Sequence, residues 1–419
     1  MEREQHPAAY PKYSSAGDSP SDNPLMGISI YRLSDRQILC LCVLALLLLG
    51  VLMVESASAG VSAQLGWNWT PFAFRHLIFA AVAFVTFLMV GLLDYSWLGR
   101  RPANLLASPV LWMLFFAVAA CAAVLIPGIG ITENGARRWL PLGPLQVQPS
   151  ELAKWAIVLF LAWWLAHRPV PLDKFFTGFL PTLAPVGLIC LLIVIQDFGT
   201  AALIALCSLT MLLAGRVRLR HLLMVIPIVL VAAAWFLMHK EYRWRRVTAF
   251  IDPYAAPQKE GYHMIQSLLS FATGGVSGRG LGNGIQKLGY LPEDTTDFIF
   301  AVICEELGLF GAMFTIALYL GILFVAWQSI RNRRDEFGRM LAFGIGSMVT
   351  LQAVINIAVA TVTVPTKGLS LPLVSAGGSG LVITSAALGL LLSASRTRGP
   401  DAVDDHIVTI LPSVNPTTA

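Results

Sequence analysis

Carboxylates inside otherwise apolar sequence are the residues of this chain that could do chemistry. Asp297 ends the run Leu-Pro-Glu-Asp-Thr-Thr-Asp and is followed by the apolar residues 298–300. Those neighbours would desolvate the carboxylate and raise its pKa, which suits a general base. Thr296 or Asp297 could instead cap the helix that begins there, and spacing alone favours the cap. Glu305, about two turns further on, falls partly on the same helix face. It is therefore a candidate partner of Asp297, with an ordinary ion pair as the alternative.

Basic residues accompany further carboxylates at the ends of other apolar stretches. Glu151 and Lys154 are three residues apart, which places them on one helix face, where a plain salt bridge is the simplest explanation. Arg137 and Arg138 could make forked hydrogen bonds to phosphate, although Arg at such a position more often anchors a helix at the membrane interface. Asp197 stands in Gln-Asp-Phe-Gly-Thr, where an external turn would explain it without a function.

Small and polar residues near the last apolar run form a third group. Lys367 lies in Pro-Thr-Lys-Gly, and Ser375 and Ser379 lie in Ser-Ala-Gly-Gly-Ser-Gly. Glycines there allow close approach of the backbone, and helix packing on small residues explains them equally well. Together the three groups fit an amphiphile with a pyrophosphate head and a lipid tail, because basic groups would hold the phosphates while a carboxylate moved a proton. The chain contains no Ser-His-Asp set, HExxH motif or P-loop.

The composition shows what kind of element must position these residues. Of the 419 residues, 56% are hydrophobic and 13% are charged, and the mean hydropathy is +0.70. Soluble domains carry about 25% charged residues, so we expect most of this chain to face lipid. That excludes a cytosolic enzyme, a nucleic-acid-binding domain and a disulfide-stapled secreted fold. The six cysteines lie in apolar runs and form no CxxC pair.

Apolar runs of about 20 residues, the length needed to cross a bilayer, predict an all-α membrane protein with ten spans. The runs are Ile38–Val54, Leu77–Leu93, Pro102–Thr132, Ser150–Ala166, Phe175–Gln196, Phe198–Gly215, Leu222–Met238, Leu307–Ile330, Met340–Thr366 and Gly368–Ser395. Lys and Arg gather in one set of short loops, which predicts that those loops and both termini are cytoplasmic.

The opposite side of the membrane then carries one long loop, residues 239–296. Within it, Tyr262–Thr273 has the apolar spacing of a short helix lying on the membrane surface. A loop of this length is usually functional or disordered, and we expect an ordered lid. The membrane domain is expected over residues 37–396, between flexible polar tails over 1–36 and 397–419.

Beyond these single residues, a series of ordered motifs runs from about Asp35 to Arg396. The motifs are Asn134-Gly-Ala-Arg-Arg-Trp139, Gln148-Pro-Ser-Glu-Leu-Ala-Lys154, Gln196-Asp-Phe-Gly-Thr200, Tyr242-Arg-Trp-Arg-Arg246 leading to Asp252-Pro253, Gly278-Arg-Gly-Leu-Gly282, Leu291-Pro-Glu through Asp297-Phe-Ile-Phe-Ala, Glu305-Glu-Leu-Gly308, Pro365-Thr-Lys-Gly368 and Ser375-Ala-Gly-Gly-Ser379. In this order they resemble the SEDS family (shape, elongation, division and sporulation). Three positions depart from the family pattern: Thr295, Ala376 and Gly380 stand where it usually has His, Tyr and Ser.

The resemblance implies a peptidoglycan glycosyltransferase that polymerises lipid II on the outer face of the bacterial cytoplasmic membrane. Asp297 matches the catalytic carboxylate of the family, which deprotonates the acceptor sugar while undecaprenyl pyrophosphate leaves the donor strand. Glu151, Lys154 and Asp197 match polar residues that line the family's central cavity. The residues expected to bind substrate are Glu151, Lys154, Asp197, Arg137, Arg138, Arg243, Arg246, Lys367, Ser375 and Ser379.

The resemblance also implies partners and a location. A class B penicillin-binding protein would crosslink the new strands, and other division proteins would join it at the division septum. A magnesium or manganese ion is expected at the pyrophosphate, with its protein ligands left open. The Pro-Thr-Lys-Gly segment and the polar N-terminal extension favour the division branch of the family over its elongation branch. A lipid II flippase and a non-catalytic scaffold of the division machinery are the alternatives.

Overall fold

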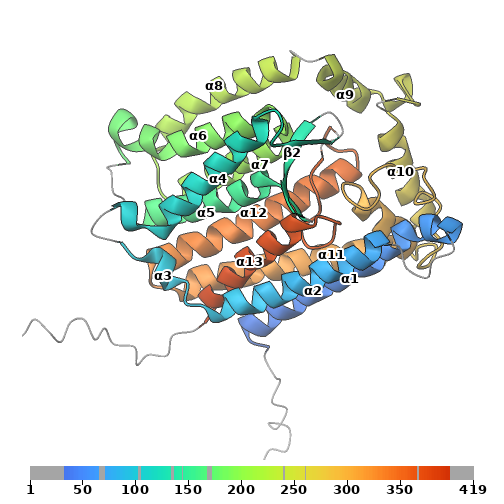
Figure 1. Ribbon diagram of the computed structural model, residues 1–419, viewed down its shortest axis with the longest axis horizontal. Coiled ribbons are helices and arrows are strands. Elements are labelled where there is room, and N and C mark those ends of the chain that lie inside the picture. Colours follow the sequence, from blue (N-terminus) through green and yellow to red (C-terminus); the bar gives the residue numbers. More distant parts are fainter. Residues whose placement is uncertain are drawn as a thin grey trace, which may run out of the picture. The chain divides into compact units, whose positions relative to one another are not determined.

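Helices make up most of the described part of the chain, as the all-α prediction requires (Figure 1). This computed structural model describes residues 33–65, 71–101, 105–133, 136–143, 145–167, 172–238, 241–259, 261–365 and 368–396. Residues 1–32 and 397–419, which include most of the two predicted tails, lie outside the described residues.

Every apolar run predicted to span the membrane contains a helix. In chain order these helices are α1 (Asp35–Leu65), α2 (Pro71–Leu92), α4 (Pro109–Leu125), α5 (Pro149–His167), α6 (Leu180–Val194), α7 (Phe198–Ala214), α8 (Leu219–Met238), α11 (Ile299–Asn332), α12 (Glu336–Ala360) and α13 (Ser379–Ala394). Three short helical pieces precede two of them: α3 (Ser96–Gly99) and η1 (Leu105–Ala107) come before α4, and the π-helical turn η2 (Phe175–Phe179) comes before α6.

The length and composition of these helices suit a membrane protein. Among the described residues, six helical stretches are long and apolar enough to cross a membrane. They belong to α1, α2, η2 with α6, α8, α11 and α12, whereas α4, α7 and α13 are apolar but shorter. The number of ten spans therefore stays a prediction.

The last predicted span begins later than its apolar run suggests. α13 starts at Ser379, and residues 368–378 form a loop, so the expectation of helix over those residues was wrong. Pro372 has no backbone N–H to donate within a helix. Gly378 has a φ of 47°, a conformation that favours glycine.

α11 is broken at Gly308, where φ is 64° and ψ is −156°. A loop from the long segment before α11 docks into this break. The backbone N–H groups of Arg279 and Gly280 donate to the carbonyls of Glu305 and Glu306, each at 3.0 Å. These bonds satisfy carbonyls that a helix break would otherwise leave without partners.

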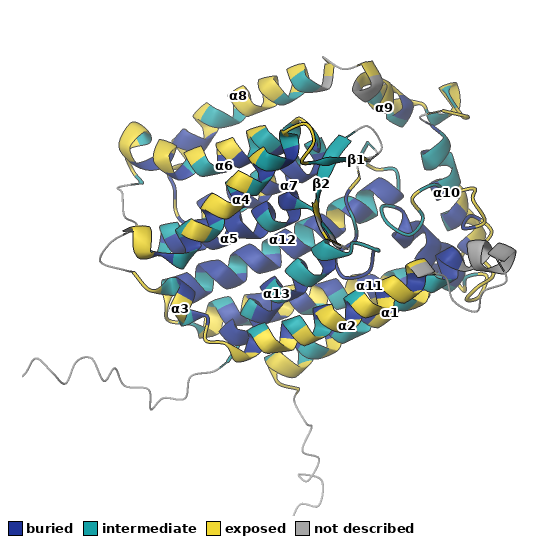
Figure 2. Cartoon of the chain, viewed as in Figure 1, coloured by how far each residue is buried: buried dark blue, intermediate teal, exposed yellow. Residues whose placement is uncertain are grey.

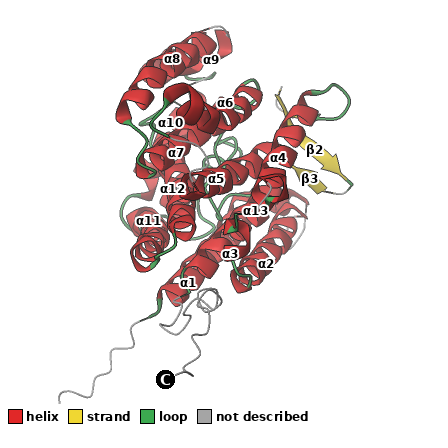
Figure 3. Ribbon diagram, turned by 90° about the vertical axis from the view of Figure 1, so that its left-hand side faces the viewer, coloured by secondary structure: helices red, strands yellow, loops and turns green. Residues whose placement is uncertain are grey.

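A small antiparallel sheet, which we did not predict, follows α4 in the chain and lies beside it, at the right-hand edge in Figure 3. Its strands, in the order β1-β2-β3, are β1 (Ile131–Glu133), β2 (Ala136–Leu142) and β3 (Leu145–Val147). The predicted span over Pro102–Thr132 ends early because α4 stops at Leu125 and the chain then turns through Gly128, whose φ is 90°. The sheet carries Arg137 and Arg138 on β2.

The long segment before α11 contains regular structure over its described residues. It holds α9 (Glu241–Ile251), η3 (Pro253–Ala255) and α10 (Tyr262–Gly274). α10 confirms the helix predicted over Tyr262–Thr273, and it packs against α11. The Ser267 hydroxyl of α10 donates to the carbonyl of Ala360 at 2.6 Å, which ties the segment to the end of α12.

Burial separates central helices from peripheral ones (Figure 2). α5 is almost wholly buried and packs against α4, α7 and α12. α13 packs mainly on α2, and α11 on α1 and α12. Large exposed apolar side chains concentrate on α2, α8 and α11, where a membrane protein presents such residues to lipid.

Candidate active site

Asp297 lies in the turn just before α11, with its side chain half-buried. The N-cap residue of α11 is Phe298, and no side chain caps the helix. The Thr296 hydroxyl donates instead to the Glu293 carboxylate at 2.8 Å. Capping by Thr296 or Asp297, the role that spacing favoured, is therefore wrong, and helix capping does not account for the Asp297 carboxylate.

Two buried side chains hold the backbone around Asp297. The Asn356 amide on α12 donates to the carbonyl of Asp297 at 2.8 Å and to the carbonyl of Leu369 at 2.6 Å. The Ser375 hydroxyl donates to the carbonyl of Thr296 at 2.5 Å. The turn before α11 is thus fastened to the loop before α13. Ser375, expected to bind substrate, makes these contacts with the backbone.

The surroundings of Asp297 favour the protonated form more than water does. Burial raises the pKa of its carboxyl to about 7, and the carboxylates of Glu293 and Asp197 act in the same direction. The guanidinium groups of Arg138 and Arg246 oppose this increase, since they favour the charged carboxylate. A carboxyl with a pKa near 7 is matched to accepting a proton at neutral pH.

Gly368 leaves room between Asp297 and Arg138. A methyl group built on Gly368 would lie 3.0 Å from Oδ2 of Asp297 and 3.9 Å from Nη1 of Arg138. The carboxylate and the guanidinium therefore border the same small space beside a glycine backbone. An anionic group entering there would meet the Arg138 charge next to the Asp297 base.

Arg138 is fixed by the turn between α6 and α7. Its Nε and Nη2 atoms donate to the carbonyl of Gln196 at 3.1 and 2.7 Å. The Gln196 side chain accepts from the backbone N–H of Arg137 at 3.1 Å. The strand β2 is thereby clamped onto the α6–α7 turn.

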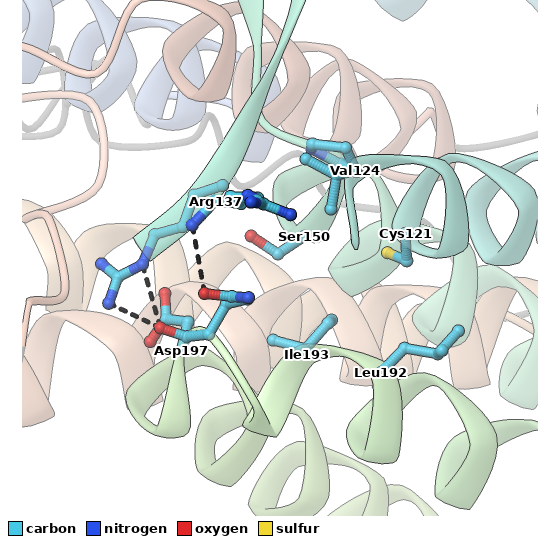
Figure 4. Close-up of a pocket in the computed structure, with 10 residues that line it drawn as sticks. Cys121, Val124, Arg137, Ser150, Leu192, Ile193 and Asp197 are labelled. Atoms are coloured by element: carbon cyan, nitrogen blue, oxygen red, sulfur yellow. Dashed lines mark hydrogen bonds between the residues drawn. The ribbon is translucent and has the colours of Figure 1, made fainter. Parts of the chain in front are cut away.

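Asp197 follows in the same turn and caps α7. Its carboxylate accepts from the backbone N–H of Thr200 at 3.1 Å and from the Thr200 hydroxyl at 2.8 Å. This agrees with the turn explanation considered from the sequence. Figure 4 shows Arg137, Ser150 and Asp197 around a cavity of about 20 Å³, which holds roughly one water molecule.

Glu151 and Lys154 form a buried ion pair on α5. The Lys154 Nζ donates to the Glu151 carboxylate at 2.8 Å and to the Gln352 side-chain oxygen on α12 at 2.7 Å. The Lys154 side chain is 1% exposed. The Gln352 amide donates in turn to the carbonyl of Ser370 at 2.8 Å. The salt bridge thus continues through α12 to the same loop that Asn356 holds.

Three more of the predicted residues have described positions. Ser379 accepts from the backbone N–H of Gln148 at 3.3 Å. Arg246 on α9 is exposed and acts on Asp297 through its charge. Glu305 was expected to support Asp297, but its carboxylate accepts from the backbone of Ile285 and Gln286, so that expectation was wrong.

Other expectations have no described counterpart. The side chains of Arg243 and Lys367 lie outside the described residues. Within the described ranges, no group of three or more His, Cys, Asp or Glu side chains could hold a metal ion.

Sequence reasoning missed Gln352, Asn356 and Gly368 as parts of this site. Gln352 and Asn356 stand four residues apart in the apolar helix α12, and both are buried. Two buried amides on one face of an apolar helix are costly unless they are hydrogen-bonded. That pattern was the available signal. For Gly368 the signal was only a glycine that allows close backbone approach, because its role depends on side chains from two other elements.

The chain is similar to a known family and to proteins with named activities. The family FTSW_RODA_SPOVE, described as a cell cycle protein, matches residues 36–399. A "probable peptidoglycan glycosyltransferase FtsW" of Dichelobacter nodosus is 38% identical over 364 residues, covering 84% of this chain and 88% of the relative. A relative of the same name from Nitrosococcus halophilus is 39% identical over 367 residues, covering 85% and 91%.

Solved structures share the fold. A chain from a structure of a peptidoglycan synthase complex, described as coordinating polymerization and crosslinking, superposes with a TM-score of 0.67 and 27% identity, covering 87% of this chain and 98% of that one. The rod shape determining protein RodA of Thermus thermophilus superposes with a TM-score of 0.60 and 27% identity, covering 87% and 97%.

Proposed function

This chain belongs to the cell cycle protein family FTSW_RODA_SPOVE, and from that premise we propose how its site polymerises peptidoglycan. The chain is a peptidoglycan glycosyltransferase, as the names of its relatives support. We propose that it acts on lipid II at the cytoplasmic membrane. The growing glycan strand is the donor, and the next lipid II molecule is the acceptor. We propose a septal role in cell division, which is supported by relatives that carry the FtsW name.

The observation that carries the proposal is the half-buried Asp297 carboxyl, whose pKa is near 7, beside Arg138. Asp297 would accept the proton of the acceptor's 4-hydroxyl group. The resulting oxygen nucleophile attacks the anomeric carbon of the donor sugar. The bond from that carbon to the pyrophosphate breaks, and undecaprenyl pyrophosphate leaves with the bonding electrons.

Charge stabilisation at the leaving group has to supply much of the acceleration. A well-placed base contributes roughly 10²–10⁴-fold, which is too little by itself for an enzymatic rate. Arg138 and Arg246 carry the positive charges that act on Asp297. We assign to them the binding of the pyrophosphate, because guanidinium groups match phosphate oxygens in geometry and charge. We also propose a magnesium or manganese ion at the pyrophosphate, where it would neutralise charge on the leaving group; the described residues offer it no group of three or more His, Cys, Asp or Glu side chains.

The small cavity beside Arg138 and Asp197 suggests that the substrate site opens when lipid II arrives. Its volume of about 20 Å³ is far below that of a sugar pyrophosphate. α9, which carries Arg246, is the element we expect to move, because it packs mainly on its chain neighbours α8 and η3, whereas Ser267 ties α10 to the end of α12.

A class B penicillin-binding protein is the proposed partner of the chain. The similar chain of known structure was solved in a complex described as coordinating polymerization and crosslinking. A transpeptidase seated on this polymerase would receive each new strand as it forms. We further propose that both termini are cytoplasmic, and that the chain works at the division septum with other division proteins.

The test is a polymerisation assay on the purified full chain with its penicillin-binding partner and lipid II. Asp297→Asn keeps the size of the side chain but removes the base, so we expect glycan ladders to disappear. Asp294→Asn is the matched control, because burial also raises the pKa of Asp294 to about 7, in the same turn. Polymerisation that persists in Asp297→Asn, or movement of lipid II across vesicles without polymer, would refute the proposal.

A further inference from the structure

A second pocket lies at the far end of the bundle from Asp297. Side chains from residues 173–177 and 218–224 line it, and its volume is about 600 Å³. α6 and α7 connect the two places: both have one end at the Gln196–Asp197 turn, and their other ends lead to η2 and to α8. In Figure 1 the chain enters α8 at the left-hand end of the picture.

The pocket has an excess of positive charge. Lys174, Arg218 and Arg220 line it together with a single carboxylate, Asp173. The ion pair between Arg218 and Asp173 is long, at 3.7 Å, and both side chains are about half exposed. Such a pair neutralises little. Neither Lys174 nor Arg220 forms an ion pair within the described part of the chain, so two cations remain available to a ligand.

A buried polar atom also points to a ligand here. His221 is 2% exposed, and its Nδ1 has no hydrogen-bond partner among the described residues. The ring packs between Phe175 and Phe179, with centroids 5.5 Å from each. A buried polar atom without a partner costs roughly 1–3 kcal/mol. In the tautomer that carries the ring proton on Nδ1, this nitrogen would donate a hydrogen bond to an oxygen atom bound in the pocket.

The walls beside these polar groups are apolar and open. Phe176 is 78% exposed and Met224 is 58% exposed. Met224 belongs to α8, and only 11% of the apolar stretch Leu219–Phe236 in that helix is buried. The ligand should therefore combine an anionic oxygen-rich head with an apolar tail. A lipid with a phosphate headgroup has both features, and basic pockets between helices on the cytoplasmic side bind such headgroups.

We propose that this pocket binds the phosphate headgroup of an anionic membrane lipid, with the acyl chains lying along α8. Lys174, Arg220 and the His221 Nδ1 would contact the phosphate oxygens, and Phe176 and Met224 the first acyl carbons. The excess of Lys and Arg in the loops at this end, Arg216 and Arg331 among them, predicts that it is the cytoplasmic one. The site is separate from polymerisation chemistry at Asp297.

The test measures lipid selectivity on the delipidated full chain by native mass spectrometry. Phosphatidylglycerol and phosphatidylcholine, which differ in net charge, are titrated in parallel. We expect the first molecule of phosphatidylglycerol to bind the chain more tightly than the first molecule of phosphatidylcholine does. Lys174→Gln with Arg220→Gln should weaken it by about fivefold for each charge removed, and His221→Phe should weaken it while keeping the aromatic packing.

The matched control is Arg331→Gln with Arg334→Gln. Both residues are exposed at the same end of the bundle and outside the pocket, so their removal should leave the selectivity unchanged. Equal losses in the two double variants would mean general attraction to basic residues and would overturn the proposal. Equal binding of both lipids would overturn it as well.

Two further arms separate the remaining outcomes. Inorganic phosphate at millimolar concentration should not displace phosphatidylglycerol, and displacement would identify a site for free anions instead. The unmodified chain is also treated with a phosphatidylglycerol that carries a photoreactive headgroup. Crosslinks in residues 173–177 and 218–224 support the pocket even where a variant fails to fold. Crosslinks confined to other segments contradict it.

Discussion

Lowering the pH from about 8 to about 6 should reduce the polymerisation rate roughly tenfold. Burial raises the pKa of Asp297 to about 7, and a general base acts only in its ionised form. The ionised fraction of such a carboxyl falls from about nine-tenths at pH 8 to about one-tenth at pH 6. A carboxyl with an ordinary pKa near 4 would stay almost fully charged over the same range. The initial rate of glycan formation from saturating lipid II, measured at closely spaced pH values, reports this ionisation.

Glu293→Gln shows whether the ionisation belongs to Asp297. The Glu293 carboxylate raises the Asp297 pKa, so its removal should lower that pKa and shift the rate profile towards acid. The variant should then retain more of its maximal rate at pH 6 than the unmodified enzyme does. Gln at this position can still accept the hydrogen bond from the Thr296 hydroxyl. A flat profile from pH 5.5 to 8, or a shift towards alkali in Glu293→Gln, would refute the reasoning.

Three further substitutions test the frame of the site. Lys154→Ala leaves the buried Glu151 without its ion pair, so we expect the protein to lose about 3–5 kcal/mol of stability, measured by thermal unfolding in detergent. Its polymerisation activity should fall less than that of Asp297→Asn. Asn356→Ala removes the donor to the Asp297 and Leu369 carbonyls. We expect kcat to fall more than about tenfold with little change in KM. An equal change in kcat and KM would argue against a role of Asn356 in positioning Asp297. Gly368→Ala puts a methyl group 3.0 Å from Oδ2 of Asp297, closer than nonbonded carbon and oxygen normally pack, so polymerisation should drop more than about tenfold while the unfolding temperature stays nearly unchanged.

The positions of the helices were predictable because helix formation in lipid is a local requirement. A segment such as Phe198–Gly215 has no water around it, so its backbone must satisfy its own hydrogen bonds. The apolar run therefore predicts α7 to within one residue at its end. Prediction failed where the local rule does not apply: at the sheet over residues 131–147, at the loop over 368–378 and at the break of α11 at Gly308. Each of those features is stabilised by partners from elsewhere in the chain.

The site divides in the same way. The sequence alone identified Asp297 as a candidate base and Glu151 with Lys154 as a pair, because neighbours in the chain or one helix turn apart determine those properties. It could not reveal that Glu305 holds the backbone at Ile285, nor that Lys154 contacts Gln352, 198 residues further on. Such contacts depend on which helix faces meet, and packing of the whole bundle decides that. The local sequence was therefore enough to identify these residues, whereas the packing of the helices determines which partners they contact.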